Sequence, residues 1–501
     1  MYTIGHFLQN RILVPPGQTL APVFNPATGQ QQGQVVLGDS HSVDLAVSAA
    51  RDALDEWAQR TPLNRARVLF RFKALVEANL DALATLISAE HGKVFSDARA
   101  EIQRGLEVVE FACGIPHLLK GEHSLNAGTG VDSFSLHQPV GVCVGITPFN
   151  FPAMVPLWMV PVALACGNTF VLKPSELDPS ASLRLAELMA EAGAPAGVFN
   201  VLNGDAGTVR NLIADSRVQA VSFVGSTPVA EAVYQQAGKR GIRAQALGGA
   251  KNHLVVMPDA DMGQVSAALM GAAYGSAGER CMAVSVAVCV GDASADALVR
   301  SLRDAIAGMK VGPGTGGEGE AHMGPLVSRA HAEKVRGYID LGVAEGAQLI
   351  CDGRRFVCEG HEHGYFVGPT LFDRVAPTMR VYQEEIFGPV LCVVRVASIE
   401  EALGLVNAHE YGNGSAIFTR DGHYARHFCE AVQVGMVGVN VPIPVPMAFH
   451  SFGGWKRSLF GPLHVHGPDG VRFYTRLKTI TARWPEPRIG HHADFVMPTL
   501  K

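Results

Sequence analysis

The chain has 501 residues and a formal net charge of −5, with 48% hydrophobic and 17% charged residues. This length exceeds what one hydrophobic core usually serves, so we expect two or three domains in an α/β protein that is rich in strand-to-helix turns. Because charges of both signs are interspersed without a long basic or acidic run, the composition gives no support for a nucleic acid or an anionic membrane as partner, and it favours a small molecule.

The first twenty residues do not have the pattern of a secretion signal. They include Asn10, Arg11 and Gln18 and lack a basic segment, an apolar core and a small-residue cleavage site, so we expect a cytoplasmic location. The nine cysteines are an odd number scattered among apolar segments, which is not a disulfide framework. Residues 139–172 carry no charge, but prolines and asparagines interrupt them, so we expect a buried strand, loop and helix there and no membrane span.

Helices are expected first in chain order. Apolar positions recur at helical spacing from Ser42 to His91 with a break at Pro62, which predicts two or three amphipathic helices. Another helix is expected from Asp97 to Cys113, because one of its faces carries an apolar stripe that comprises Ile102, Leu106, Val109 and Cys113. Arg104 lies on a different side of this helix.

From Val140 onward, short apolar runs alternate with helical stretches. The first set has expected strands at 140–146, 169–172, 198–202 and 220–223, with a helix at 183–192. The second set lies between Asn252 and about Asn440, with expected strands at 253–257, 285–290 and 391–396 and expected helices at 261–274 and 294–309. Such alternation predicts right-handed βαβ units on parallel sheets. We place the boundary between the two sets at residues 247–251.

Two other patterns have a structural interpretation. Residues 314–319 match a dinucleotide-binding fingerprint, but they follow a helix and precede no helical run, so we interpret them as a surface loop. A zinc site is the alternative interpretation of Cys351, Cys358, His361 and His363, although closed structural sites usually have tighter cysteine pairs. We expect no metal, and instead an exposed turn that leads into a strand around Tyr365.

Two motifs carry chemistry. Residues 223–227, Phe-Val-Gly-Ser-Thr, end a strand and open a helix that Ser226 or Thr227 can cap, so the amides there can hold a phosphate. Residues 278–281, Gly-Glu-Arg-Cys, place Cys281 at the head of a strand, where the positive charge of Arg280 favours its thiolate. A core cysteine is one alternative. A cysteine–histidine hydrolase is another, although no paired histidine is evident.

Together these motifs resemble the aldehyde dehydrogenase superfamily over nearly the whole chain and in the same order. The matching segments, besides that of Cys281, are Pro-Phe-Asn-Phe-Pro at 148–152, Lys-Pro-Ser-Glu at 173–176, Phe-Val-Gly-Ser at 223–226, Leu-Gly-Gly at 247–249 and Glu-Glu-Ile-Phe-Gly-Pro at 384–389. The chain is most similar to the branch that acylates coenzyme A from methylmalonate semialdehyde or malonate semialdehyde. This closer resemblance depends on Gly-Gly-Ala-Lys-Asn-His at 248–253, Arg280, and Ser-Phe-Gly-Gly-Trp-Lys at 451–456.

The resemblance implies an α/β fold in three parts. They are a Rossmann-like NAD-binding domain at 1–121 and 141–247, a catalytic domain at 248–440, and a small β oligomerisation element with a C-terminal arm at 122–140 and 441–501. In the last part, a hairpin near 122–136 would combine with a strand near 478–483. The resemblance also implies a homodimer or a homotetramer.

The resemblance further implies roles for single residues. Cys281 is the nucleophile, and Asn150 with the Cys281 amide binds the oxyanion, for which an asparagine between two prolines is a rigid donor. Arg104 and Arg280 hold a substrate carboxylate through charge-assisted hydrogen bonds. NAD is contacted by Lys173 and Glu176 at the adenosine ribose, Ser226 at the pyrophosphate, Glu385 and Phe387 on the nicotinamide side, and Thr147, Phe149 and Gly248 through backbone or packing contacts. A carboxylate at Glu176 repels a 2′-phosphate and therefore favours NAD over NADP.

Three departures from the family pattern bear on the reaction. Hydrolytic relatives have a glutamate base where this chain has Ala246, so water attack is expected to be poor. Ala230 replaces a usual glycine, and Leu177 stands where the branch often has arginine. The expected reaction is oxidation of the aldehyde through a Cys281 thioester, followed by transfer of the acyl group to coenzyme A. The alternatives are a hydrolytic aldehyde dehydrogenase that acts on an uncharged aldehyde, and a catalytically idle relative.

Overall fold

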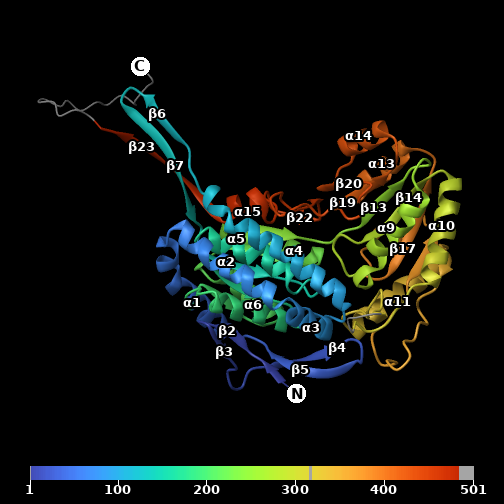
Figure 1. Ribbon diagram of the computed structural model, residues 1–501, viewed down its shortest axis with the longest axis horizontal. Helices are drawn as coiled ribbons and strands as arrows, with labels where there is room; N and C mark the ends of the chain where they lie inside the picture. Colours follow the sequence, from blue (N-terminus) through green and yellow to red (C-terminus); the bar gives the residue numbers. More distant parts are fainter. Residues whose placement is uncertain (1, 315–318, 485–501) are drawn as a thin grey trace, which may run out of the picture.

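The computed structural model describes residues 2–314 and 319–484. Two large sheets, of eight and seven strands, form neighbouring α/β lobes, and a three-stranded arm projects from the first lobe (Figure 1). The expected α/β class is confirmed. Most of the segment interpreted as a surface loop, 314–319, lies outside the described residues. Among the described helices, none is long and apolar enough to cross a membrane.

The first large sheet has a parallel centre. In spatial order its strands are β22 (Leu459–Phe460), β12 (Arg243–Leu247), β11 (Val218–Val224), β8 (Val142–Ile146), β9 (Thr169–Lys173), β10 (Phe199–Val201), β2 (His6–Leu8) and β3 (Arg11–Leu13). The chain adds β9 and β10 on one side of β8 and then β11 and β12 on the other, and all neighbouring pairs among these strands are parallel. This is the Rossmann strand order. Its direction reverses between β8 and β11, so the carboxyl ends of these strands border the crevice where open α/β sheets bind ligands.

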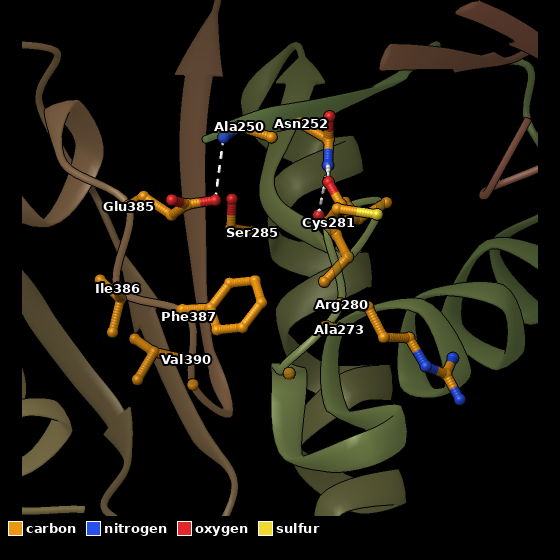
Figure 2. A pocket seen from close by; sticks show the side chains of 14 residues that line it. Ala250, Asn252, Ala273, Arg280, Cys281, Ser285, Glu385, Ile386, Phe387 and Val390 are labelled. Atoms are coloured by element: carbon orange, nitrogen blue, oxygen red, sulfur yellow. Dashed lines mark hydrogen bonds between the residues drawn. The ribbon is translucent and has the colours of Figure 1, made fainter. Parts of the chain in front are cut away.

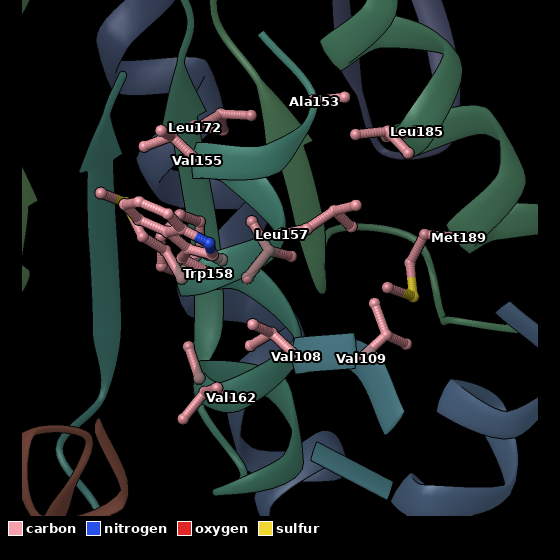
Figure 3. Close-up of a cluster of buried hydrophobic side chains, with 14 of the residues drawn as sticks. Val108, Val109, Ala153, Val155, Leu157, Trp158, Val162, Leu172, Leu185 and Met189 are labelled. Atoms are coloured by element: carbon pink, nitrogen blue, oxygen red, sulfur yellow. The ribbon is translucent and has the colours of Figure 1, made fainter. Parts of the chain in front are cut away.

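Helices cover both faces of this sheet. One face packs against α1 (Ser40–Gln59), α7 (Ala206–Ala214) and α8 (Thr227–Arg240). The other face packs against α2 (Pro62–Ala78), α4 (Phe95–Cys113), α5 (Met154–Ala165) and α6 (Ser180–Glu191), and Figure 3 shows this core around Trp158. Strand β8 serves both cores, because Val142 and Val144 point to the first and Cys143 to the second.

The helices predicted in the first hundred residues are present. The run from Ser42 to His91 contains three of them, α1, α2 and α3 (Leu80–His91). Pro62 is the first residue of α2, a position where the missing N–H removes no helical hydrogen bond. Helix α4 begins two residues before the predicted start at Asp97, and its predicted apolar stripe is buried.

The second large sheet is parallel except at one edge. Its strands are, in spatial order, β15 (Gln348–Cys351), β16 (Thr370–Asp373), β17 (Val390–Val396), β14 (Val284–Val290), β13 (Asn252–Val256), β19 (Gly414–Phe418) and β20 (Met436–Val439). Only β15 is antiparallel to its neighbour within this sheet. The helices of this lobe are α9 (Met262–Tyr274), α10 (Asp292–Ala307), α11 (Arg329–Ala344), α12 (Arg380–Gln383), α13 (Ile399–Ala408) and α14 (Gly422–Ala431).

The prediction of a strand around Tyr365 is wrong. Residues 361–369 are irregular, because the backbone of Tyr365 bonds to loop residues and not to a neighbouring strand: its N–H donates to the Pro26 carbonyl, and its carbonyl accepts from the Leu326 N–H. Cys351 lies in β15 and not in the expected exposed turn. Within 2–314 and 319–484, no group of three or more His, Cys, Asp or Glu side chains is arranged to hold a metal ion.

Small sheets complete the fold. An N-terminal sheet contains β1 (Tyr2–Ile4), β5 (Gln30–Val36) and β4 (Leu20–Asn25), and the arm contains β23 (Thr475–Arg483), β7 (Val131–Pro139) and β6 (His123–Gly128). Strand β18 (Tyr411–Gly412) pairs with β21 (Trp455–Lys456). The remaining short elements are the 3-10 turns η1 (Ile115–His117) and η2 (Gly275–Gly278) and helix α15 (Gly467–Phe473). The C-terminal segment therefore contributes to the first large sheet through β22 as well as to the arm.

Candidate active site

Cys281 lies on the loop between η2 and β14, at the head of the strand as the sequence predicted. The turn before it is left-handed, with φ of 52° at Ser276, 52° at Ala277 and 73° at Gly278. Non-glycine residues adopt this conformation at an energetic cost, which is a frequent feature of functional sites. The Cys281 carbonyl accepts a hydrogen bond of 2.9 Å from the side-chain amide of Asn252 (Figure 2) and one of 3.0 Å from that of Asn413. These bonds fix the backbone and leave the sulfur facing a cavity.

Arg280 favours the Cys281 thiolate as expected, but burial outweighs its effect in the free protein. Burial, followed by the negative charge of Glu385, raises the pKa of the Cys281 thiol to about 12, although the neighbouring backbone amides and Arg280 oppose the shift. The influence of Arg280 is small because its guanidinium points away from the sulfur (Figure 2) and forms an ion pair of 2.6 Å with Asp97. Cys281 is therefore a protonated thiol near neutral pH, and catalysis requires a proton acceptor.

Asn150 is buried beside the cysteine loop. It follows β8, and its side-chain N–H donates to the Glu279 carbonyl, two residues before Cys281, at 3.0 Å. Among the described residues, this is the hydrogen bond that the side-chain NH2 group of Asn150 donates. Its second hydrogen is therefore available to a ligand. The same residue lines a cavity together with Cys281. This arrangement is suited to an oxyanion that forms on a carbonyl attacked by Cys281.

This first cavity, of about 220 Å³, lies at the point where the strand order of the first sheet reverses. Five of the predicted cofactor residues line it: Phe149, Ser226, Gly248, Glu385 and Phe387. The other three lie next to it at the ends of β8 and β9. There Thr147 donates its N–H to the Lys173 carbonyl at 3.1 Å, and the Lys173 ammonium pairs with Glu176 at 2.8 Å.

The start of α8 differs from the expectation. Ser226 occupies the N-cap position but its side chain forms no capping bond, while the Thr227 hydroxyl accepts from the Gly249 N–H at 2.8 Å. Ser226 is exposed and lines the crevice immediately before the first residue of α8. Such a helix start suits a phosphate.

Two further features of the crevice fit a dinucleotide. A Cβ added at Gly249 would lie 2.5 Å from the Glu385 carboxylate, so the backbone and this carboxylate approach each other as closely as a glycine permits. Burial raises the pKa of Glu385, which accepts from the Ala250 N–H at 2.8 Å. The hydroxyl oxygen of Thr147 is buried and has no hydrogen-bond partner among the described residues. The crevice therefore offers glycine backbone, an open helix start and a carboxylate.

Aromatic rings and His331 support the far wall of the crevice. The Phe387 and Phe149 rings meet edge to face at 6.0 Å, and Phe387 has a φ of 60°. The Phe387 carbonyl accepts from the His331 ring at 2.7 Å. Burial lowers the pKa of His331, so the imidazole is neutral near pH 7. A neutral ring that donates to this carbonyl holds Phe387 in its left-handed conformation.

A second cavity, of about 420 Å³, reaches Cys281 from the other side. Its lining includes both predicted substrate arginines, Arg104 and Arg280, and the aromatic side chains of Phe151, Trp158 and Phe452. Arg104 donates to the Pro446 carbonyl at 3.0 Å and pairs with Glu107 at 2.5 Å. The cavity thus carries two guanidinium groups next to an apolar wall, together with the carboxylate residues Asp97 and Glu101, and it ends at the cysteine.

Ala246 lies in β12 and is completely buried in the core between that strand and its helices. It lines neither cavity next to Cys281. A glutamate introduced there would place a charge in an apolar core, so it would destabilise the protein before it could serve water. The position therefore supplies no general base.

The sequence analysis missed several residues that hold the site together: Lys93, Asp97, Glu101, Asn252, Glu279, His331 and Asn413. Their partners are far apart in the chain. Asp97 is 183 residues from Arg280, and Asn413 is 132 residues from Cys281. For Asn252 and Glu279, the signal in the sequence was their place in the motifs at 248–253 and 278–281. For the others, neither periodicity nor spacing relates the residue to its partner.

Sequence comparisons agree with this geometry. A model of the aldehyde dehydrogenase family matches residues 14–480. A malonate-semialdehyde dehydrogenase from Pseudomonas aeruginosa is 58% identical over 501 residues, which cover 100% of both chains. Another, from Halalkalibacterium halodurans, is 48% identical over 93% of this chain and 95% of its own.

Solved structures have the same fold. The structure of a methylmalonate-semialdehyde dehydrogenase from Oceanimonas doudoroffii superposes with a TM-score of 0.96 at 57% identity, and covers 97% of this chain and 99% of that one. A structure from Sinorhizobium meliloti, assigned to the same activity and complexed with NAD, superposes with a TM-score of 0.96 at 53% identity and the same coverage.

Proposed function

Because the chain belongs to the aldehyde dehydrogenase family, we propose that it oxidises methylmalonate semialdehyde or malonate semialdehyde with NAD and transfers the acyl group to coenzyme A. The observation that carries this proposal is the position of Cys281 between two cavities. One cavity contains two arginines and the other is a dinucleotide crevice. The names of the relatives, which are malonate- and methylmalonate-semialdehyde dehydrogenases, support the choice of substrate.

The proposed reaction begins with substrate binding. Arg104 and Arg280 hold the carboxylate in the second cavity, which directs the aldehyde carbon to Cys281. The Cys281 thiol gives its proton to water in the cavity, and the thiolate adds to that carbon. The resulting oxyanion accepts from Asn150 and from the Cys281 amide. NAD, when bound in the crevice, accepts the hydride. Collapse of the oxyanion to a carbonyl as the hydride leaves gives a thioester on Cys281.

The residues of the crevice would hold the dinucleotide. The carboxylate of Glu176 accepts from the ribose hydroxyls, Ser226 and the start of α8 hold the pyrophosphate, and Glu385 and Phe387 lie on the nicotinamide side. A structural neighbour was solved with NAD, which supports this assignment.

The acyl group leaves Cys281 in two further steps. The free carboxylate is lost as carbon dioxide and a proton is taken up at the adjacent carbon, which leaves an acetyl or propionyl thioester. The coenzyme A thiolate then attacks the thioester carbonyl and releases the Cys281 thiolate, so the products are acetyl-CoA or propionyl-CoA. Release by water is disfavoured because Ala246 cannot act as a base, and this distinguishes the proposal from a hydrolytic aldehyde dehydrogenase.

We further infer an oligomer in which the arm of β6, β7 and β23 contacts another subunit, as a homodimer or a homotetramer in the cytoplasm. The exposed leucines of the arm support this, since Leu125 is 71% and Leu477 is 63% exposed in the single chain. Exposed leucines on a projecting sheet are typical of an interface.

The experiment that tests the function is NADH formation from a panel of aldehydes with and without coenzyme A, together with identification of the acyl product. We expect the semialdehyde acids to be preferred over propanal, and acetyl-CoA or propionyl-CoA to form. Release of the free acid at full rate without coenzyme A would support the hydrolytic alternative. A lack of NADH formation from every aldehyde would support an idle relative.

A further inference from the structure

A buried ion pair lies behind the oxyanion donor. Lys93, in the turn between α3 and α4, and Glu101, on α4, have no exposed side-chain surface, and their charged atoms are 2.6 Å apart. Removing two charges from water costs several kcal/mol for each ion, and a buried pair often adds little net stability. Because the pair lies next to the active site, its contribution is to be found in the groups that it holds in place.

Both members of the pair bond to the segment that carries Asn150. The Lys93 ammonium donates to the Asn150 carbonyl at 2.8 Å and lies 4.1 Å from the centre of the Phe151 ring. The Glu101 carboxylate accepts from the backbone N–H groups of Ala153, at 2.9 Å, and Met154, at 3.1 Å. The pair thus fixes both ends of residues 150–154, between the end of β8 and the first turn of α5.

The other side of Asn150 is held by the cysteine loop. Its side-chain amide donates to the Glu279 carbonyl, and the buried Glu279 carboxylate accepts from the Val327 N–H at 3.2 Å. That carboxylate also lies 3.7 Å from the ring of His91. His91 and Lys93 are separated by Gly92, with a φ of 88°, where an added Cβ would lie 2.7 Å from Pro325. One turn therefore holds Asn150 on its backbone side through Lys93 and places the His91 ring next to Glu279, whose carbonyl accepts from the Asn150 side chain.

We propose that Lys93 and Glu101 are positioning residues for the oxyanion donor, and that their ion pair holds the carbonyl of Asn150 so that its side-chain amide faces the carbon attacked by Cys281. The proposal rests on the proposed function in one respect, the addition of Cys281 to an aldehyde carbon. Lys93 lines neither cavity next to Cys281, and Glu101 borders the second cavity with its side chain fully buried. Loss of the pair lets Asn150 shift, and a shift of about 1 Å in such a group lowers a reaction rate about 100-fold.

The test is the pre-steady-state burst of NADH with NAD and saturating propanal in the absence of coenzyme A. The burst amplitude counts folded active sites, whereas its rate constant reports how well the oxyanion is stabilised. The variants are Lys93→Met, Glu101→Gln, Asn150→Ala and each of the first two combined with Asn150→Ala. Lys73→Met, which breaks an ion pair of 2.7 Å with Glu77 on the partly exposed face of α2, is the control.

We expect Lys93→Met and Glu101→Gln to lower the burst rate constant about 10- to 100-fold with most of the amplitude kept, and Lys73→Met to change neither. In the Asn150→Ala background the same substitutions should have almost no further effect, because the group that they position is gone. A further variant, Lys93→Met/Glu101→Gln, has no charge at either of these two positions, and it should regain thermal stability but not the rate constant.

Two outcomes would overturn the proposal. One is a lower amplitude with an unchanged rate constant, which would show that the pair serves folding alone. The other is a rate loss of the same factor with and without Asn150, which would show that the pair acts elsewhere. If the wild-type protein itself gave no burst with propanal, the proposed function would have failed, so the two failures are distinguishable.

Discussion

At the scale of single residues, the proposed nucleophile is a thiol that is not activated in the free protein. The sulfur of Cys281 is enclosed, and the nearby carboxylate of Glu385 makes its ionisation less favourable. The one cation next to it in sequence, Arg280, is engaged by Asp97. Activation of the thiol must therefore accompany ligand binding, which changes both the water and the charge around the sulfur.

The high pKa of this thiol predicts how it reacts with iodoacetamide in the absence of ligands. Only the thiolate reacts, and a pKa of about 12 means that its fraction rises about tenfold per pH unit across the neutral and mildly alkaline range. We expect the alkylation rate of the Cys281 peptide, followed by mass spectrometry, to rise in this way from about pH 7 to about pH 10 without a plateau. A plateau near neutral pH would show a thiolate that is already formed.

Replacement of Glu385 tests the cause of this shift. Glu385→Gln removes a negative charge that raises the pKa of Cys281, so the thiol should be alkylated a few-fold faster at the same pH. The matched control is Glu384→Gln, since Glu384 pairs with Arg380 on the surface at 2.6 Å. Equal rates in the two variants would mean that Glu385 has no influence on the thiol.

Arg104 should determine preference for an acid substrate. A charge-assisted hydrogen bond to a carboxylate contributes about 1.5–3 kcal/mol, so Arg104→Leu should lower kcat/KM for malonate semialdehyde about 10- to 100-fold and leave propanal almost unaffected. Arg99→Leu is the control on the same helix, because Arg99 pairs with Asp81 at 3.2 Å away from the cavity. An unchanged ratio of the two substrates in Arg104→Leu would remove Arg104 from substrate recognition.

At the scale of elements, local patterns predicted what lies within one helix or strand. The helical period before His91, the apolar runs of β8 and β14 and the place of Cys281 at a strand head all follow from short stretches of sequence. Contacts between residues far apart in the chain did not follow from such patterns. The place of β22 beside β12 depends on two residues with no periodic signal, and the Asp97 pair that removes Arg280 from Cys281 joins α4 to a distant loop.

The arm is the element whose role is most open to a direct test. Strand β23 is an edge strand that pairs with β7 on one side only, and an unpaired edge on a projecting sheet is suited to a second subunit. Leu477→Lys should therefore shift the particle to a smaller mass in sedimentation velocity. Leu63→Lys is the control, because Leu63 on α2 is equally exposed, at 62%. A monomeric wild-type protein, or the same mass in both variants, would contradict the role of the arm.

At the scale of the whole molecule, the two lobes bring together what neither contains alone. The first sheet supplies the crevice, Asn150 and the start of α8, and the second supplies Cys281, Glu385 and Phe387. The family resemblance identified these residues, but not the buried contacts that orient them. Ala246, buried in the core of the first sheet, supplies no base at this junction.

The most direct test of the central claim is a pre-steady-state measurement of NADH with malonate semialdehyde and NAD. Without coenzyme A, we predict a burst of about one NADH per active subunit followed by a slow rate, and rapid turnover to acetyl-CoA once coenzyme A is added. Cys281→Ala should bind NAD but show no burst. Fast steady NADH formation from the wild-type protein with no thiol acceptor present would contradict acyl transfer to coenzyme A as the proposed route of release.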